Sequence, residues 1–126
     1  MENTKNRRLE ERLCYQWPVL FAEDFTKSVS EGIMVDVSSG GLAFLCRADG
    51  NCPSLGQKLK MRFSIPRADE DDFSAMTSFI RTGCVLRIEL IKSSLCRAAI
   101  QFDEPLTLKP CELASIALMQ THVKKL

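Results

Sequence analysis

The sequence predicts a mainly β fold, a six-stranded antiparallel β-barrel followed by a C-terminal α-helix. Apolar and polar residues alternate with a period of two in about six short segments, which is typical of half-buried strands. Turns containing glycine, serine or proline separate these segments, and only the last segment has a helical period. Because strands closed on one another leave no exposed edge, a small barrel is the favoured arrangement.

The first three strands are expected between Cys14 and Cys46. The first run of alternating apolar residues comprises Tyr15, Trp17, Val19 and Phe21. Pro18 within this run predicts an edge position or a bulge, since proline cannot donate to a ladder. The second run alternates Ile33, Val35 and Val37 with Met34, Asp36 and Ser38. Gly40 and Gly41 then predict a tight turn, and residues 42–46 the returning strand of a hairpin.

The clearest alternation predicts a fourth strand with one core face and one solvent face. It sets Leu59, Met61, Phe63 and Ile65 against Lys58, Lys60, Arg62 and Ser64. Pro66 ends this strand, and the acidic residues 69–72 are interpreted as a solvated loop. Two more strands are expected at about 77–91 and 95–102, joined by a turn at 92–94. Pro110 suits a first helical turn. The apolar stripe expected to cover the barrel consists of Leu113, Ile116, Ala117 and Met119.

Length and composition limit the classes of protein that remain. A chain of 126 residues is expected to form one domain, with residues 1–13 as a basic arm ahead of a barrel and helix at 14–126. Hydrophobic residues make up 45% and charged residues 26%, which excludes a disordered tail and membrane insertion. The 17 basic residues nearly balance the 16 acidic ones, so binding to a nucleic acid polymer is not expected.

The six cysteines indicate a reducing, cytoplasmic environment. The N-terminus is charged and lacks an apolar secretory segment, so the thiols are expected to stay reduced. Their spacing does not match a zinc site, and His122 is the only histidine, so no metal is expected. His122 also has no serine or aspartate in motif spacing, and the sequence contains no P-loop. We therefore expect no catalytic residues and no enzyme activity.

A first candidate binding motif lies in the basic arm. Arg8 and Arg12 form an R-x-x-x-R pair, with Arg7 directly before it. A guanidinium group binds phosphate oxygens through a planar fork and stacks its face on aromatic rings, so two of them suit a planar, doubly charged ligand. The alternative is an ordinary solvated terminus, in which Glu10 and Glu11 neutralise the arginines.

A second candidate motif has the pattern D-x-S-x-x-G, formed by Asp36, Ser38 and Gly41. In a strand the carboxylate and the hydroxyl point to the same face. A carboxylate accepts hydrogen bonds only, which suits the paired N–H donors on the edge of a guanine. Gly41 is expected to allow positive φ and to let a ligand approach closely. The alternative is a hairpin turn in which these residues serve only local backbone geometry.

Together the two motifs resemble the PilZ domain, the bacterial receptor module for cyclic di-GMP, over nearly the whole chain. The resemblance implies a six-stranded barrel with a terminal helix and cyclic di-GMP as ligand, with no cofactor. It implies that Arg8 and Arg12 hold phosphates and stack on guanine. Asp36 and Ser38 then bind the guanine edge, and Gly41 keeps the pocket open. Arg7, directly before the arginine pair, is the residue type that accompanies an intercalated ligand dimer in the family.

The function expected from this resemblance is that of a receptor that changes conformation on binding cyclic di-GMP and signals to a separate partner protein. One alternative is a PilZ-like adaptor that contacts proteins without nucleotide. Another is a small barrel that binds single-stranded nucleic acid, which the 7% aromatic content and balanced charge disfavour. The sequence leaves the effector, the pathway and the oligomeric state, a homo-oligomer included, open.

Overall fold

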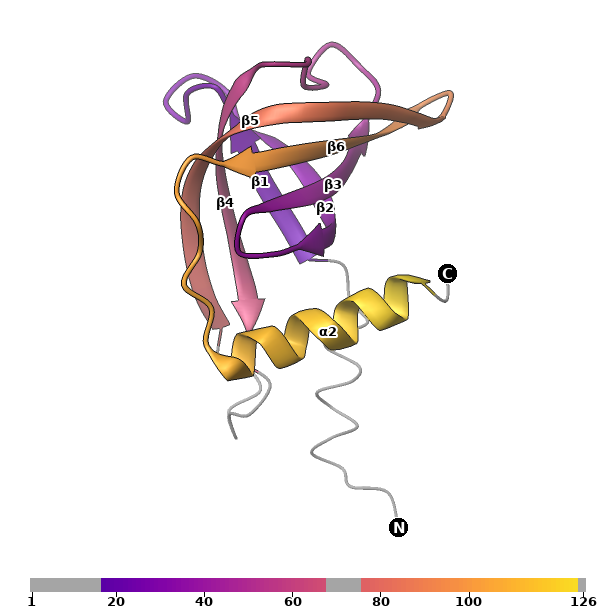
Figure 1. Cartoon of the computed structure of the whole chain (residues 1–126). Coiled ribbons are helices and arrows are strands. Elements are labelled where there is room, and N and C mark those ends of the chain that lie inside the picture. The colour runs from indigo at the N-terminus through magenta and orange to yellow at the C-terminus, as the bar shows by residue number, and fades with distance from the viewer. Residues whose placement is uncertain (1–16, 68–75, 125–126) are drawn as a thin grey trace.

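The computed structural model describes residues 17–67 and 76–124, which form an antiparallel barrel and one helix (Figure 1). In chain order the elements are β1 (Trp17–Ala22), β2 (Ser30–Val37), β3 (Gly41–Arg47), β4 (Lys58–Pro66), β5 (Met76–Lys92), β6 (Leu95–Phe102) and α2 (Pro110–Lys124). The strands close in the order β1-β2-β3-β6-β5-β4, and every neighbouring pair is antiparallel. The predicted fold class is confirmed.

Strand β4 shows how the sequence pattern builds the core. Its four apolar residues point inward and are buried, whereas its lysines and Arg62 face solvent, as the alternation predicts. Phe63 stacks between Phe79 of β5 and Phe102 of β6, with ring centroids 5.6 and 6.0 Å away. The ring centroids of Phe21 on β1 and Phe44 on β3 lie 4.6 Å apart. Aromatic rings from five strands therefore fill the barrel interior.

Strand β2 departs from simple alternation because it carries a bulge. The pairing with β3 shifts between Met34 and Asp36, so one extra residue, Val35, is inserted there. As a result Met34 and Val37 are both buried, although they are three residues apart, and Ile33 and Val35 are only half-buried. The period-two pattern predicts the strand correctly, but it does not predict which side chains point inward.

Pro18 occupies a place where its missing N–H is tolerated. It pairs with Ile33 of β2, but the ladder between β1 and β4 begins only at Val19. The predicted edge position is wrong for the strand as a whole, since β1 pairs on both sides in the closed barrel. At Pro18 itself the strand is paired on one side, as proline requires.

Helix α2 lies across one end of the barrel and packs against β2 and β4 (Figure 1). The predicted apolar stripe is only half correct, because Ile116 and Met119 are buried while Leu113 is 51% exposed and Ala117 is exposed as well. The buried face instead contains Cys111, Glu112 and Ser115. No helix among the described residues combines the length and apolarity that crossing a bilayer requires.

The two polar residues on the buried face of α2 are satisfied by hydrogen bonds. Glu112 accepts one bond from the backbone N–H of Lys109 and another from the hydroxyl of Thr77 on β5, at 2.9 and 2.7 Å. The first of these is a capping contact at the helix N-terminus. Ser115 donates to the carbonyl of Pro66 at the end of β4, at 2.7 Å. These bonds fix the position of α2 against the barrel.

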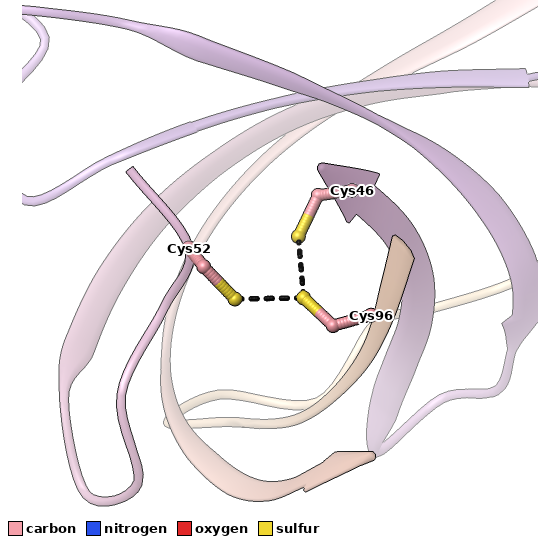
Figure 2. Close-up of side chains that lie close together, drawn as sticks. All are labelled: Cys46, Cys52 and Cys96. Atoms are coloured by element: carbon pink, nitrogen blue, oxygen red, sulfur yellow. Dashed lines mark hydrogen bonds between the residues drawn. The ribbon is translucent and has the colours of Figure 1, made fainter. Parts of the chain in front are cut away.

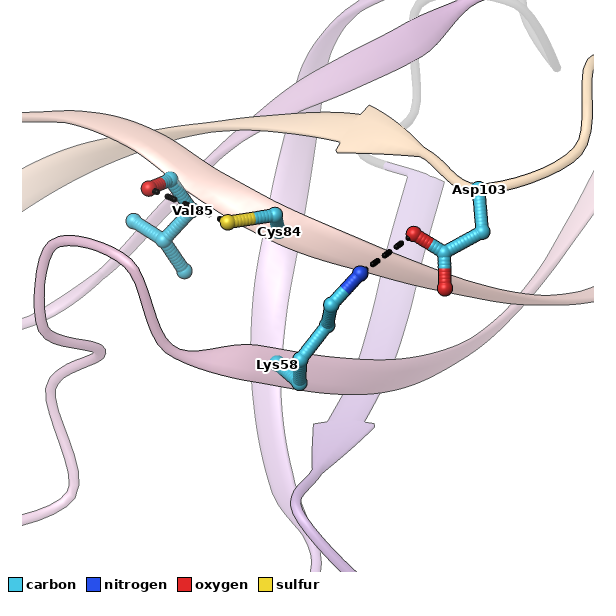
Figure 3. A network of polar contacts seen from close by, with 4 residues as sticks. All are labelled: Lys58, Cys84, Val85 and Asp103. Atoms are coloured by element: carbon cyan, nitrogen blue, oxygen red, sulfur yellow. Dashed lines mark hydrogen bonds and ion pairs between the residues drawn. The ribbon is translucent and has the colours of Figure 1, made fainter.

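Strand β5 is long enough to pair with two neighbours in succession. It pairs with β4 up to Cys84 and with β6 from Gly83 onward. Near Cys84, where the partner of β5 changes from β4 to β6, Lys58 of β4 forms an exposed ion pair with Asp103, just beyond β6. Its Nζ lies 2.6 Å from Oδ1 of Asp103 (Figure 3). The hydrogen bond to Asp103 raises the pKa of Lys58. This pair joins the start of β4 to the end of β6.

Candidate functional site

The turn between β2 and β3, residues 38–40, is held in place from two sides. Across the hairpin, the N–H of Ser38 donates to the carbonyl of Gly41 at 2.8 Å. The N–H of Phe102, the last residue of β6, donates to the carbonyl of Gly40, and the N–H of Leu106, in the segment after β6, donates to that of Ser39, at 2.9 and 2.7 Å. A turn with this many backbone bonds is a rigid platform for the side chains that it presents.

Asp36 and Ser38 project from the same side of this hairpin. Both side chains are exposed, and Val37 between them is buried with 1% exposure. The hydroxyl of Ser38 makes only a long contact of 3.5 Å with the carbonyl of Gly41. The hairpin therefore presents a carboxylate and a hydroxyl side by side to solvent. The carboxylate can accept hydrogen bonds from a polar ligand, and the hydroxyl can donate or accept one.

Gly41 is required here for a reason other than the expected one. Among the described residues only Gly56 has a positive φ, so Gly41 does not need a left-handed conformation. A Cβ on Gly41 would collide instead with the backbone carbonyl oxygen of Ile100 on β6. The glycine lets β3 and β6 approach closely, which holds the hairpin against the barrel. The expectation of positive φ at Gly41 is wrong.

Helix α2 reaches the hairpin through Gln120. The side-chain amide of Gln120 donates one hydrogen bond to Oδ1 of Asp36 and another to the carbonyl of Val37, the latter at 3.2 Å. An amide N–H bound to this carboxylate resembles chemically the N–H donors on a guanine edge. Gln120 and a guanine would thus compete for the same acceptor.

A groove of about 620 Å³ separates the hairpin from α2. Its hairpin side is formed by Val37, Ser38 and Ser39, and its helix side includes Leu113, Ala117 and Gln120. The two stripe residues that do not reach the core therefore line this groove. A mixed apolar and polar lining and a volume within about 300–1,000 Å³ are typical of small-molecule sites. Ser38 lines the groove, and Asp36 borders it through its hydrogen bond with Gln120, so the described residues offer a place for a planar ligand there.

The structure brings together three of the six predicted ligand-binding residues. Asp36, Ser38 and Gly41 lie on one hairpin. Arg7, Arg8 and Arg12 lie outside the described residues, as does the acidic stretch 69–72. Gln120 and the groove beside it were missed by sequence reasoning, because the apolar stripe of α2 was assigned wholly to the barrel. The signal in the sequence is a polar residue, the half-buried Gln120, three positions after Ala117.

Comparison with known families decides the kind of domain. The sequence model of the PilZ domain matches residues 6–112. The chain belongs to the PilZ domain family. The matched range of this PilZ domain includes the R-x-x-x-R pair and the whole barrel, and it ends within the first turn of α2. No curated protein matches the chain.

Solved structures show the same fold. The inhibitor of motility MotI/DgrA from Bacillus subtilis is similar with a TM-score of 0.54 and 19% identity, covering 88% of this chain and 46% of that one. This PilZ domain thus spans about half the length of MotI/DgrA. The PilZ domain of YcgR from Escherichia coli, solved with cyclic di-GMP, has a TM-score of 0.50 and 12% identity, covering 87% and 82% of the two chains.

Proposed function

We propose that this PilZ domain is a non-catalytic cytoplasmic receptor for cyclic di-GMP that signals to a separate protein. The observation that supports this most is the rigid hairpin, which presents Asp36 and Ser38 beside a groove of ligand size. Membership of the PilZ family and the cyclic di-GMP in the YcgR domain support the choice of ligand.

In this proposal the guanine base lies against the hairpin. The carboxylate of Asp36 accepts hydrogen bonds from the paired N–H groups of the guanine edge, and the hydroxyl of Ser38 binds the same edge beside it. The groove wall formed by Leu113 and Ala117 contacts the apolar ring face. These contacts distinguish guanine from adenine, whose corresponding edge does not offer the same pair of donors to one carboxylate.

The arginines of the arm supply the positive charge that the hairpin lacks. Arg8 and Arg12 bind the two phosphates through their forks and stack on the bases, and Arg7 accompanies a second, intercalated nucleotide. Closure of the arm over the ligand then changes the surface that a partner protein meets. The domain then has two states, with the arm open or closed, and a ligand shifts the equilibrium between them only if it binds one more tightly. The contacts between the arginines and the phosphates form only in the closed state and provide this difference in affinity.

Isothermal titration with cyclic di-GMP tests the receptor function. At protein concentrations of about 20 μM, a sub-micromolar site gives a saturating heat signal whose stoichiometry reports one or two nucleotides per chain. Cyclic di-AMP is the matched control, since it keeps the phosphates and changes the base edge. Absence of heat with cyclic di-GMP, or equal heat with both nucleotides, would refute the receptor assignment.

Replacing Gln120 is expected to strengthen nucleotide binding. In the original chain, guanine must displace the Gln120 amide from the carboxylate of Asp36. Gln120→Ala removes this competing hydrogen bond, so affinity for cyclic di-GMP should rise by about fivefold, equivalent to about 1 kcal/mol. The titration above measures this change, with Glu104→Ala as a control on an exposed acidic residue after β6. Weaker binding by Gln120→Ala would mean that the amide positions Asp36 instead of competing with the ligand.

A second candidate is a nucleotide-independent adaptor. It is favoured by the contact between Gln120 and Asp36, which engages the motif carboxylate within the protein, and by three exposed apolar residues on the outer part of β5. These residues are Leu86, Leu90 and Ile91. An unchanged melting temperature with cyclic di-GMP, together with nucleotide-independent capture of one partner that is lost in Leu90→Asp, would identify this function.

A further inference from the structure

Three cysteines that are far apart in the sequence meet at one end of the barrel (Figure 2). Cys46 lies on β3 and Cys96 on β6, directly opposite each other in the ladder, with their sulfurs 3.3 Å apart. Cys52 comes from the loop between β3 and β4, and its sulfur lies 2.7 Å from that of Cys96. All three sulfurs lie within 4.8 Å of one another. We call Cys46, Cys52 and Cys96 the thiol cluster.

The thiol cluster is separate from the candidate nucleotide site. Gly41, at the hairpin, and Cys46 stand five residues apart on β3, which corresponds to about 17 Å along a strand. Helix α2 covers the hairpin end of β2, whereas the loop carrying Cys52 lies at the other end of the barrel (Figure 1). Any role of the cluster is therefore additional to nucleotide binding.

The framework around the cluster is rigid on two sides. Cys46 and Cys96 are buried and fixed by the hydrogen-bonded ladder of β3 and β6. The loop is ordered by Asp49, whose carbonyl accepts from the N–H of Cys52 and whose carboxylate accepts from that of Asn51, at 3.0 and 2.9 Å. The cluster is thus built by secondary structure and a turn, and does not depend on chance proximity of flexible side chains.

The thiols carry protons that a cation can displace. Burial, followed by the hydrogen bond with Cys96, raises the pKa of Cys52 to about 11, and the same causes raise the pKa of Cys46 further. A bound cation stabilises several thiolates at once and releases their protons.

We propose that Cys46, Cys52 and Cys96 bind one thiophilic divalent d¹⁰ cation of the zinc type, with a fourth coordination position open to solvent. Each thiol releases its proton to solvent as the metal–sulfur bond forms, and no electron is transferred. Soft thiolate ligands favour Zn²⁺ over hard cations such as Mg²⁺ and Ca²⁺. Three protein ligands with one open position are a known coordination pattern for zinc.

The dimensions of the cluster suit such an ion. Thiolates about 2.3 Å from zinc lie about 3.8 Å from one another. The sulfur of Cys96, now 3.3 Å from that of Cys46 and 2.7 Å from that of Cys52, therefore needs to move away by about 0.5 and about 1 Å respectively. Side-chain rotation of Cys52, which is half-buried in a loop, provides this room. A hollow of about 230 Å³ lined by Cys46 and Asp49 borders the cluster and gives solvent and the ion access to it. Glu31 and Arg47 also line this hollow, so it carries charges of both signs.

Titration of the full-length chain with Cd²⁺ tests the proposal. The protein is first reduced, freed of metal with a chelator and kept without oxygen. We expect the ultraviolet thiolate-to-cadmium absorption band to saturate at one ion per chain, and Zn²⁺ to displace the Cd²⁺ and abolish the band. Because even the loss of an outer partner weakens metal binding by about 10–100-fold, Cys52→Ser should weaken it by more than about a hundredfold.

Cys84→Ser is the matched control, because Cys84 is also a half-buried cysteine but lies on β5 outside the cluster, with its sulfur 3.9 Å from the carbonyl of Val85 (Figure 3). This variant should bind Cd²⁺ like the original chain. Equal binding by Cys52→Ser and the original chain would overturn the proposal, and so would the absence of a saturable band. A Cys52–Cys96 disulfide that forms in air despite one equivalent of Zn²⁺ would overturn it too.

Discussion

The double variant Arg8→Ala/Arg12→Ala is expected to lose at least about a hundredfold in affinity for cyclic di-GMP, because each charge-assisted contact contributes about 1.5–3 kcal/mol. Two alanines remove both phosphate forks and both stacking surfaces from the arm. The hairpin residues remain, so weak binding through the guanine edge persists. Isothermal titration measures the loss, and the melting temperature without nucleotide should not change.

Two further variants separate charge from geometry in this experiment. Arg12→Lys keeps the positive charge but loses the planar fork, so it should bind more weakly than the original chain and more tightly than Arg12→Ala. Arg87→Ala removes an exposed arginine on β5, whose Nε lies 3.2 Å from Glu89, and should leave affinity unchanged. If Arg87→Ala weakens binding as much as the double variant, general charge rather than the arm binds the ligand.

Gly41→Ala is expected to destabilise the protein by about 3 kcal/mol, since overpacking a tight contact costs about 1–3 kcal/mol or more. The added methyl would collide with the carbonyl oxygen of Ile100, and two paired backbones cannot move aside as a side chain can. For a domain of this size the melting temperature should fall by about 10 °C. Urea denaturation gives the free energy of unfolding directly.

The neighbouring glycine offers a control with the same substitution. A Cβ on Gly40 meets no atom within 4 Å, and the residue does not have positive φ. Gly40→Ala should therefore change stability by no more than about 0.5 kcal/mol. Equal destabilisation by the two variants would show that the turn conformation, and not the approach of β3 to β6, requires glycine at Gly41.

The strands could be predicted from the sequence because their pattern is local. In β4 each apolar residue faces inward without exception, since nothing interrupts the pleat. In β2 the bulge at Val35 shifts the pattern, and no residue there marks it, because valine is an ordinary strand residue. Burial along β2 thus depends on how β3 pairs with it, which a single strand does not encode.

The helix and the site depended more on tertiary contacts. Glu112 and Ser115 are polar and lie outside the predicted apolar stripe, yet they are almost fully buried. Their burial is possible because Thr77, Lys109 and Pro66 supply their hydrogen-bond partners. The motif residues Asp36 and Ser38 were found from their spacing alone. Gln120 was not, because its contact with Asp36 bridges 84 positions of sequence.

The thiol cluster also depends on tertiary contacts. Spacing rules detect ligands that are close in sequence, such as pairs separated by two residues. Cys46 and Cys96 are fifty positions apart and meet only because β3 and β6 pair in a particular register. The prediction that no metal binds rests on spacing and stays a prediction, because spacing does not describe cysteines on paired strands.

The length of β5 also has a consequence for solubility. Among the described residues, β5 pairs beyond Val85 only with β6, so within that part of the chain its other edge is unpaired, and Leu86 and Leu90 there are exposed. Such edges recruit strands from other molecules and promote aggregation. Two bulges in this segment and the charge of Arg87 disturb the flat geometry that such recruitment needs. The chain thereby extends a long hairpin from its barrel while keeping that hairpin a poor template for sheet growth between molecules.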